Sequence, residues 1–275
     1  MNFYFLFFIF YITFLFSYSQ ENVSGRKVIS YENIREKDII WFKKTLRIID
    51  LREEINHTLY LPDEPEGGFN DRMNLIDLLL YSIKKELITA YSAENSYNMF
   101  RKKISFTEIK NNGFFTDGEI AKPDSKYYYN EDSKIKRGEI NTFQVTELLI
   151  MEGWFVYKGS SKMEVRILGI CPKRHYYEKD EHKNNLIKKK LFWVYFPNIR
   201  QFLAKHQAFN PINSTENKTF DDIFSKRLFN SFILREENIF NNRQINQYTI
   251  GLNSVVEEER KKRKMRNMES DLWSN

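Results

Sequence analysis

Apolar positions in the first half of the chain follow two different periods, with polar stretches between them. Residues 39–51 carry apolar side chains in a strand-like pattern, and the following stretch 60–72 contains two prolines and two glycines, which is typical of a loop. Asn74 then stands at an N-cap position with Asp77 three residues on. Apolar residues recur behind it at helical spacing, which predicts a buried helix face: Leu75, Ile76, Leu79, Ile83 and Leu87.

The second half of the chain shows a hairpin pattern and two further strand and helix signals. Residues 154–171 contain a short aromatic strand, a Gly-Ser-Ser turn and an alternation of apolar with polar residues, which predicts a hairpin. Bulky residues at 191–196 precede Pro197, so a strand is expected to run into a helix there. Thr219 and Asp222 predict a second capped helix. The residues expected on its buried face are Phe220, Ile223, Phe224, Leu228 and Phe232.

These patterns predict an α+β fold of short antiparallel sheets or hairpins packed with amphipathic helices. A shift of 145 positions lays Asn74 on Thr219 and the strand at 46–51 on the strand at 191–196, so the fold is open to interpretation as two pseudo-repeated units. We expect a first unit at 36–110, a polar connection at 111–138 and a second unit at 139–253. A charged, exposed helix at 254–275 completes the predicted organisation.

The N-terminus has the pattern of an export signal. Apolar residues run from Phe3 to Phe16 and end in a small-x-small triplet, Ser17 to Ser19, which predicts a signal peptide at 1–19. An uncleaved anchor would look similar, although about 14 apolar residues fall short of the roughly 20 that span a membrane. Residues 20–35 are polar and predict a flexible segment. Cys171 lies far from the cleavage site, so membrane association is expected to be indirect, through a partner.

Composition narrows the class of protein further. With 275 residues, of which 41% are hydrophobic and 29% charged, the chain is long enough to bury one or two cores. The net charge of +6 belongs to the segment after residue 19, because the signal contains no charged side chain. Lys, Asn, Ile, Phe and Tyr are abundant together, which is typical of an AT-rich genome, so we do not interpret the basic charge as a sign of nucleic-acid binding.

Motifs for catalysis or metal binding are missing from the sequence. It contains no glycine-rich phosphate loop, no His-Glu-x-x-His, no Gly-x-Ser-x-Gly and no paired cysteine motif. His175 and His182 lie seven residues apart, with Asp180 and Glu181 between them. They belong to a lysine-rich stretch, 173–190, that we interpret as a loop, and its lysines would repel a cation. We therefore expect no metal, no cofactor and no catalytic residue.

Two further candidates for chemistry also have structural interpretations. Asp221 and Asp222 would suit general acid–base catalysis. In the first turn of a helix, however, carboxylates accept hydrogen bonds from free N–H groups and interact favourably with the positive end of the helix dipole. Cys171 follows Ile170 at the end of a predicted strand, where a buried, unreactive thiol is expected. The sequence thus favours a protein that is not an enzyme.

Aromatic residues mark two candidate partner-binding sites. On the predicted strand at 191–196, Phe192 and Val194 face one way while Trp193 and Tyr195 face the other. The second face must be covered by the same chain or by a neighbouring subunit. In the C-terminal helix, Glu257 to Glu259 precede basic residues by four positions, which supports an exposed helix. Its terminal Leu272 and Trp273 are expected to anchor on a partner or on the chain's own fold.

Several stretches of the chain together resemble one family. They are "RIIDLREEIN", "MEVRILGICP", "LFWVYFPNIRQFLAKHQAFN", "TFDDIFSKRLFNSFILREEN" and the terminal "ESDLW". In this order they are similar to the GldN (PorN) family, a periplasmic component of the type IX secretion and gliding-motility machinery of Bacteroidetes. The resemblance extends from about Trp41 to Trp273.

The resemblance implies a non-enzymatic structural subunit located in the periplasm. It would assemble with an outer-membrane lipoprotein of the GldK (PorK) type into large rings that contain many copies of the chain. It would also contact the periplasmic part of the GldM (PorM) motor protein, and it would be attached to the outer membrane through the lipoprotein. Two other classes stay open: a periplasmic module that binds or hydrolyses cell-wall glycan, and a peripheral membrane protein that uses its basic C-terminal helix.

Overall fold

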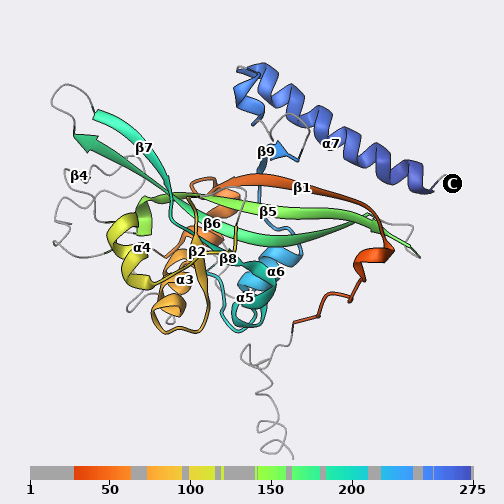
Figure 1. Cartoon of the computed structure of the whole chain (residues 1–275). Coiled ribbons are helices and arrows are strands. Elements are labelled where there is room, and N and C mark those ends of the chain that lie inside the picture. The colour runs from red at the N-terminus through yellow and green to blue at the C-terminus, as the bar shows by residue number, and fades with distance from the viewer. Residues whose placement is uncertain are drawn as a thin grey trace, which may run out of the picture.

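A nine-stranded antiparallel sheet organises the computed structural model of the chain (Figure 1). Its main path runs β3-β2-β8-β6-β5-β1-β9, and β4 and β7 pair with the far part of β6. The α+β class predicted from the sequence is confirmed, although one large sheet takes the place of several short ones. The structure describes residues 28–62, 73–94, 99–114, 119–120, 140, 142–158, 163–179, 184–209, 218–237, 244–249 and 251–273.

The strands of the sheet vary widely in length. Their bounds are β1 Ile39–Asp50, β2 Ala90–Ser92, β3 Lys103–Ile104, β4 Glu119–Ile120, β5 Val145–Tyr157, β6 Glu164–Lys179, β7 Asn184–Lys190, β8 Phe192–Tyr195 and β9 Phe232–Glu236. The helices are mostly short. They are α2 His57–Tyr60, α3 Leu75–Lys84, α4 Phe106–Gly113, α5 Phe196–Leu203, α6 Phe220–Ser225 and α7 Leu252–Trp273.

The β5–β6 hairpin forms the centre of the sheet. Leu149 lies opposite Cys171 and Ile150 opposite Ile170, so each pair places one side chain from each strand on the same face. The predicted hairpin is confirmed. Strand β1 pairs with β5 on the other side, which confirms the strand expected at 39–51. The register shifts at Met151 and Glu152 of β5, opposite Gly169 and Ile167 of β6.

Helices α3, α5 and α6 pack on one face of this sheet and form the main core with it (Figure 1). The Asn74 side chain accepts a hydrogen bond from the Asp77 N–H at 2.8 Å, which confirms the predicted N-cap of α3. Pro197 lies in the first turn of α5, as predicted. Leu87 was expected in the buried helix face, but α3 ends before it and Leu87 is 61% exposed, so this prediction is wrong.

Helix α6 begins where the sequence predicted and ends earlier. Thr219 and Asp222 form the expected capping box. The helix stops at Ser225, and Arg227 then takes a left-handed backbone conformation with φ 54°, which turns the chain away from the helix axis. Leu228 and Phe232, expected in the buried helix face, therefore lie outside the helix and are 36% and 42% exposed.

The two expected units interleave within the one sheet. Each contains a run of one strand, two helices and a second strand: β1, α2, α3, β2 in the expected unit 36–110 and β8, α5, α6, β9 in the expected unit 139–253. Strand β1 of the first segment pairs with β9 of the second, and β8 of the second pairs with β2 of the first. Both pairs lie outside the central β5–β6 hairpin, one at each side, so the two runs are joined in one sheet.

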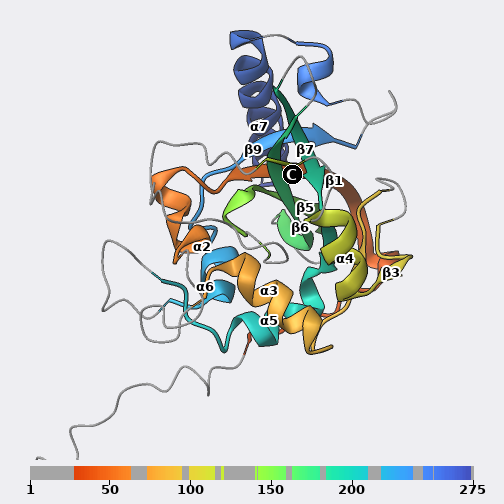
Figure 2. The ribbon, with the colours of Figure 1, turned by 90° about the vertical axis from the view of Figure 1, so that its left-hand side faces the viewer.

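Several expected segments lie wholly or partly outside the described residues. The predicted signal at 1–19, residues 20–27, and most of the polar connection at 111–138 are among them. The lysine-rich stretch 173–190 was expected to be a loop, but its described residues, 173–179 and 184–190, pair as an antiparallel ribbon of β6 and β7, so this prediction is wrong for them. Helix α7 lies beside strand β9 (Figures 1 and 2). Among the described helices, none is long and apolar enough to cross a membrane.

Candidate interaction surface

The face of the sheet opposite the main core carries a second apolar cluster. Its buried members are Leu46, Ala93, Leu149, Met151, Cys171 and Trp193. We call this side of the sheet the second face. Among the described residues, the partly buried side chains packed against the cluster come from strands and from Met99 and Phe100, and none comes from a helix. The two faces of the sheet are therefore covered in different ways.

Large apolar side chains are exposed along the borders of the second face. Phe42 pairs in register with Phe155, Phe232 pairs with Ile48, and Tyr195 pairs with Gly169. Phe42 is 44% exposed, Phe232 42% and Tyr195 36%. Apolar groups gathered on one face of a soluble protein commonly mark a contact surface.

Phe100 covers the centre of this face on the side of β8. Its ring lies edge-on to Trp193 at 6.2 Å and to Tyr195 at 5.4 Å between centroids. A Cβ atom at Gly169 would lie 2.5 Å from the Phe100 ring, so only glycine leaves room for this packing. Phe100 itself has a left-handed backbone with φ 67°. The chain thus supplies its own cover for part of the second face.

The predicted orientations of the β8 side chains are confirmed. Phe192 and Val194 lie in the main core, and Trp193 lies in the cluster of the second face. Trp193 is only 3% exposed because Phe100 packs over it, whereas Tyr195 reaches the surface. A partner contact at Trp193 and Tyr195 stays a prediction, with Tyr195 as the accessible member of the pair. Leu272 and Trp273 lie in the last turn of α7, and their side chains are outside the described set.

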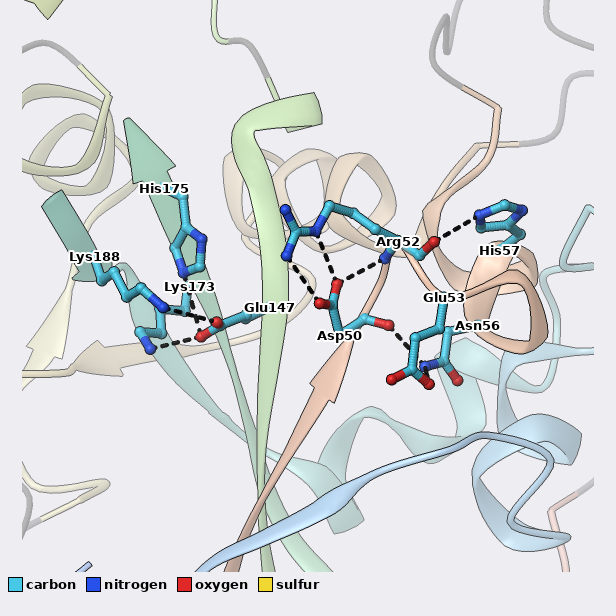
Figure 3. A network of polar contacts seen from close by, with 9 residues as sticks. All are labelled: Asp50, Arg52, Glu53, Asn56, His57, Glu147, Lys173, His175 and Lys188. Carbon is cyan, nitrogen blue, oxygen red and sulfur yellow. Dashed lines mark hydrogen bonds and ion pairs between the residues drawn. The ribbon is translucent and has the colours of Figure 1, made fainter. Parts of the chain in front are cut away.

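A polar network closes one end of the second face (Figure 3). Glu147, at the start of β5, accepts a hydrogen bond from the Lys173 ammonium at 2.6 Å and lies 3.4 Å from the Lys188 Nζ. The His175 Nε2 lies 3.3 Å from the same carboxylate. Burial raises the pKa of Glu147, but the adjacent His175 and Lys173 outweigh it and hold the pKa at about 2. Three basic side chains of the β6–β7 ribbon therefore share one carboxylate.

A second group of polar contacts lies at the end of β1, next to this network (Figure 3). Arg52 donates from Nε and Nη2 to the two oxygens of Asp50, at 3.0 and 2.9 Å. The Asn56 amide donates to the Asp50 carbonyl at 2.7 Å and to the Asn230 carbonyl at 3.2 Å. These contacts fix the turn after β1 and join it to the segment before β9, so their role is structural.

Of the residues considered for a metal site, the structure describes only His175. His175 contacts Glu147, while Asp180, Glu181 and His182 lie outside the described residues. Within the described ranges, no group of three or more His, Cys, Asp or Glu side chains could hold a metal ion.

The two aspartates at the start of α6 have separate structural roles. Asp222 caps the helix as expected, whereas Asp221 binds the Arg200 Nε at 2.9 Å and Nη2 at 3.2 Å. The expectation that both carboxylates cap the helix is therefore wrong for Asp221, because its side chain turns toward α5.

The thiol of Cys171 is fully buried in the second face. Burial raises its pKa to about 12, so the reactive thiolate is scarce at neutral pH. The expectation of a buried thiol is confirmed.

A buried charge cluster was not predicted from the sequence. Glu152 of β5 is fully buried and accepts hydrogen bonds from Arg227 Nη2 at 2.6 Å and from Trp154 Nε1 at 3.1 Å. Arg47 lies 3.9 Å from the same carboxylate and donates to the Ser231 hydroxyl at 2.9 Å. The alternation of side chains along β1 carried a signal for this cluster. Thr45, Arg47 and Ile49 share one face of the strand, so Arg47 occupies a position where a buried apolar residue would be expected.

The comparisons with known proteins agree with the resemblance in the sequence. A family model described as "Gliding motility associated protein GldN" matches residues 34–274, which is nearly the whole described chain. No curated protein matches the chain. The GldN family is a component of the gliding-motility and type IX secretion machinery. The chain belongs to the GldN family.

Proposed function

We propose that this protein is a non-enzymatic structural subunit that works in the periplasm and uses the second face of its sheet to bind a partner. The observation that carries the proposal is the apolar border of this face, where Phe42, Tyr195 and Phe232 are each more than a third exposed. Aromatic side chains on a rigid sheet make large contacts at low entropic cost, which suits an assembly interface.

The partner that the family favours is an outer-membrane lipoprotein of the GldK (PorK) type. The chain would join it in a ring of many copies and contact the periplasmic part of a GldM (PorM) motor protein. The lipoprotein would attach the complex to the outer membrane. The predicted export signal at 1–19 and the buried Cys171 support this arrangement, since a cysteine in the sheet core is not available for lipidation.

Co-purification with the lipoprotein tests the proposal. The mature chain, residues 20–275, and a variant with Phe42→Ser and Tyr195→Ser would each be co-expressed with the lipoprotein, and the mass of the product measured by light scattering. We expect a stable assembly of very high mass from the unchanged chain and a loss of at least tenfold in co-purified lipoprotein from the variant.

A matched control uses apolar residues exposed elsewhere. Tyr81 and Leu87, in and just after α3, are 44% and 61% exposed and lie away from the second face. Substituting both by Ser is expected to leave the assembly unchanged. Full assembly by the Phe42 and Tyr195 variant, with a native circular dichroism spectrum, would rule out the second face as the contact.

We propose a further contact at the C-terminal end of α7, where Leu272 and Trp273 would anchor the helix on a partner. Aromatic anchors at the end of a projecting element contribute a large share of binding energy. Removing residues 272–275 while keeping the rest of α7 would test this contact in the same co-purification. Unchanged recovery of lipoprotein and of motor protein would remove it.

A further inference from the structure

Exposed lysines stand among the apolar residues of the second face, and the first of them lies on β1. Lys44 follows Phe42 by two positions, so both side chains point to this face, and both are exposed. The Lys44 ammonium lies 5.6 Å from the centre of the Phe42 ring. Within the described residues, Lys44 has no carboxylate partner. Its charge is therefore available to a partner of opposite charge.

A second lysine lies on the other side of the central β5–β6 hairpin. Lys103 of β3 pairs in register with Tyr91, and Tyr91 pairs with Trp193. Side chains directly opposite one another in antiparallel strands share a face, so Lys103 lies on the second face, in one row with Trp193. Lys103 is exposed and forms no ion pair with any residue that the structure describes.

The β6–β7 ribbon places a third basic group at one end of the face (Figure 3). Lys173 and Lys188 both contact the carboxylate of Glu147, at 2.6 and 3.4 Å. The Lys188 side chain is 48% exposed, whereas that of Glu147 is 11% exposed. Because one carboxylate does not neutralise two ammonium groups, the ribbon keeps a positive charge near the surface.

The carboxylates that the described strands place on this face are paired within the chain. They are Asp50, Glu147 and Glu164, whose partners Arg52, Lys173 and Arg166 lie at 2.9, 2.6 and 3.3 Å. The charges that remain available on the described strands of the second face are therefore positive, and they stand around an apolar centre.

We propose that the partner covers the second face with an acidic protein surface, whose carboxylates reach Lys44, Lys103 and the β6–β7 ribbon around an apolar middle. This inference rests on the proposed function, because it concerns the partner that binds the second face. Interfaces commonly combine an apolar centre with a polar rim. Opposite charges on the two rims speed the encounter of the partners, and like charges exclude wrong partners.

The spacing of the lysines favours a folded protein over anionic lipid headgroups. Membranes are commonly recognised by about four to eight basic side chains gathered in one place. Lys44 and Lys103 instead stand singly on strands that are five steps apart in the sheet. That separation is roughly 24 Å across the sheet at the usual strand spacing. Lysines fixed this far apart fit carboxylates that are held in fixed positions on a folded partner.

Charge reversal in the mature chain tests the proposal. Binding to the lipoprotein, prepared without its lipid, is measured by surface plasmon resonance for the variant with Lys44→Glu and Lys103→Glu. The matched control is Lys85→Glu with Lys205→Glu, which changes the net charge equally. Both control positions are exposed and follow helices that pack on the other face, and Lys85 lies 5.9 Å from an aromatic ring, much as Lys44 does. The variant with Phe42→Ser and Tyr195→Ser is measured in parallel.

We expect the Lys44 and Lys103 variant to associate at least tenfold more slowly than the unchanged chain at about 0.05 M salt, and the control to associate normally. Raising the salt to about 0.5 M should slow the unchanged chain and bring the two rates together, because salt screens exposed charges. The Phe42 and Tyr195 variant should instead dissociate faster, since it loses apolar contact and keeps its charge.

Three results would overturn the proposal. If the charge-reversed variant associates as fast as the unchanged chain while the Phe42 and Tyr195 variant binds weakly, the second face is the contact but the partner is not acidic. If neither variant differs from the unchanged chain, the contact on the second face fails as well. If the unchanged chain floats with phosphatidylglycerol vesicles, and the charge-reversed variant does not but still binds the lipoprotein normally, the lysines serve a membrane.

Discussion

The buried carboxylate of Glu152 accepts a 2.6 Å hydrogen bond from Arg227, a residue whose backbone is in the left-handed region with φ 54°. The pair joins the middle of β5 to the turn between α6 and β9. Arg47 donates to Ser231 in the same turn, at 2.9 Å. The path of the chain into the edge strand β9 is thus fixed by charged groups in the interior of the fold.

Substituting Arg227 by Ala is expected to lower the free energy of unfolding by about 2–3 kcal/mol. A buried charge that loses its partner costs about 3–5 kcal/mol, and the nearby Arg47 reduces that loss. Urea unfolding of the mature chain measures the change. The control is Arg260→Ala, because Arg260 forms an exposed pair with Glu257, and its removal should leave the free energy of unfolding nearly unchanged. Equal losses for the two variants would contradict the buried role of Arg227.

Replacing Arg227 by Gly separates the backbone from the side chain. Both substitutions remove the guanidinium group, but Gly adopts a positive φ without the steric cost that Ala pays, which is about 1–2 kcal/mol. Gly at this position should therefore be more stable than Ala by about 1 kcal/mol, the reverse of their order inside a helix. Unfolding both variants in urea gives the difference directly. Ala more stable than Gly would show that the turn relaxes to another conformation.

Glu147 should give the protein a pH-dependent stability on the acid side. Its pKa in the folded chain is about 2, below the ordinary value of 4.5, so the folded state favours the carboxylate. This stabilisation is fully present above about pH 4.5 and is lost as the pH falls from 4.5 toward 2. Because the lysine side of the cluster is partly exposed, we expect the ionised Glu147 to contribute about 1–2 kcal/mol to the free energy of unfolding.

Acid unfolding of Glu147→Gln measures this contribution. At pH 7 the variant should be less stable than the unchanged chain. Between pH 4.5 and pH 2 the stability of the variant should fall by less than that of the unchanged chain. Glu259→Gln, at an exposed position of α7, is the control for removing one carboxylate. Parallel stability curves for Glu147→Gln and the unchanged chain across this range would contradict the role of the cluster.

Cys171 should be unreactive in the folded protein. Its side chain is fully buried, and burial raises the pKa of the thiol to about 12, so the thiolate is rare even at pH 8. We expect alkylation by iodoacetamide at pH 8 to be slower by at least 100-fold in buffer than in denaturant. Mass spectrometry of the intact chain follows the reaction. Rapid labelling of the folded chain would show that the second face opens on that time scale.

The capped helices were predictable because their signals are local. The side chain of Asn74 caps an N–H three residues away, and Thr219 does the same for Asp222, so each start is encoded within four residues. The end of α6 was not predictable in this way. It depends on Arg227, whose side chain is held by Glu152, 75 residues earlier in the chain.

The order of the strands was beyond sequence reasoning for a similar reason. Strand β1 pairs with β9, and Thr45 lies opposite Glu236, a distant contact that no local pattern specifies. The ribbon at 173–190 was missed because its register places Lys173 opposite Lys190, an unfavourable pair in isolation. Glu147, from the neighbouring strand β5, offsets that repulsion only once the sheet has formed.

The segment that leads into β1 is held by Tyr31, whose ring contacts two guanidinium groups. The centre of the ring is 4.3 Å from Arg200 and 4.8 Å from Arg166. Arg200 also donates to the carbonyl of Ile29 at 2.9 Å. Residues 20–35 were expected to be flexible, and this contact predicts that their last part, from Ile29 on, is docked on the fold.

Replacing Tyr31 by Ala should release this segment with little effect on the rest of the fold. We expect hydrogen exchange within residues 29–34 to quicken by about tenfold, since two cation–π contacts of about 0.5–1 kcal/mol each are lost, while the urea midpoint changes little. Ile29→Ala is the matched control, because the Ile29 side chain is 87% exposed and should contribute nothing to docking. Equal exchange in the two variants would show that the segment is held by its backbone, through the Ile29 carbonyl and Arg200, and not by the ring of Tyr31.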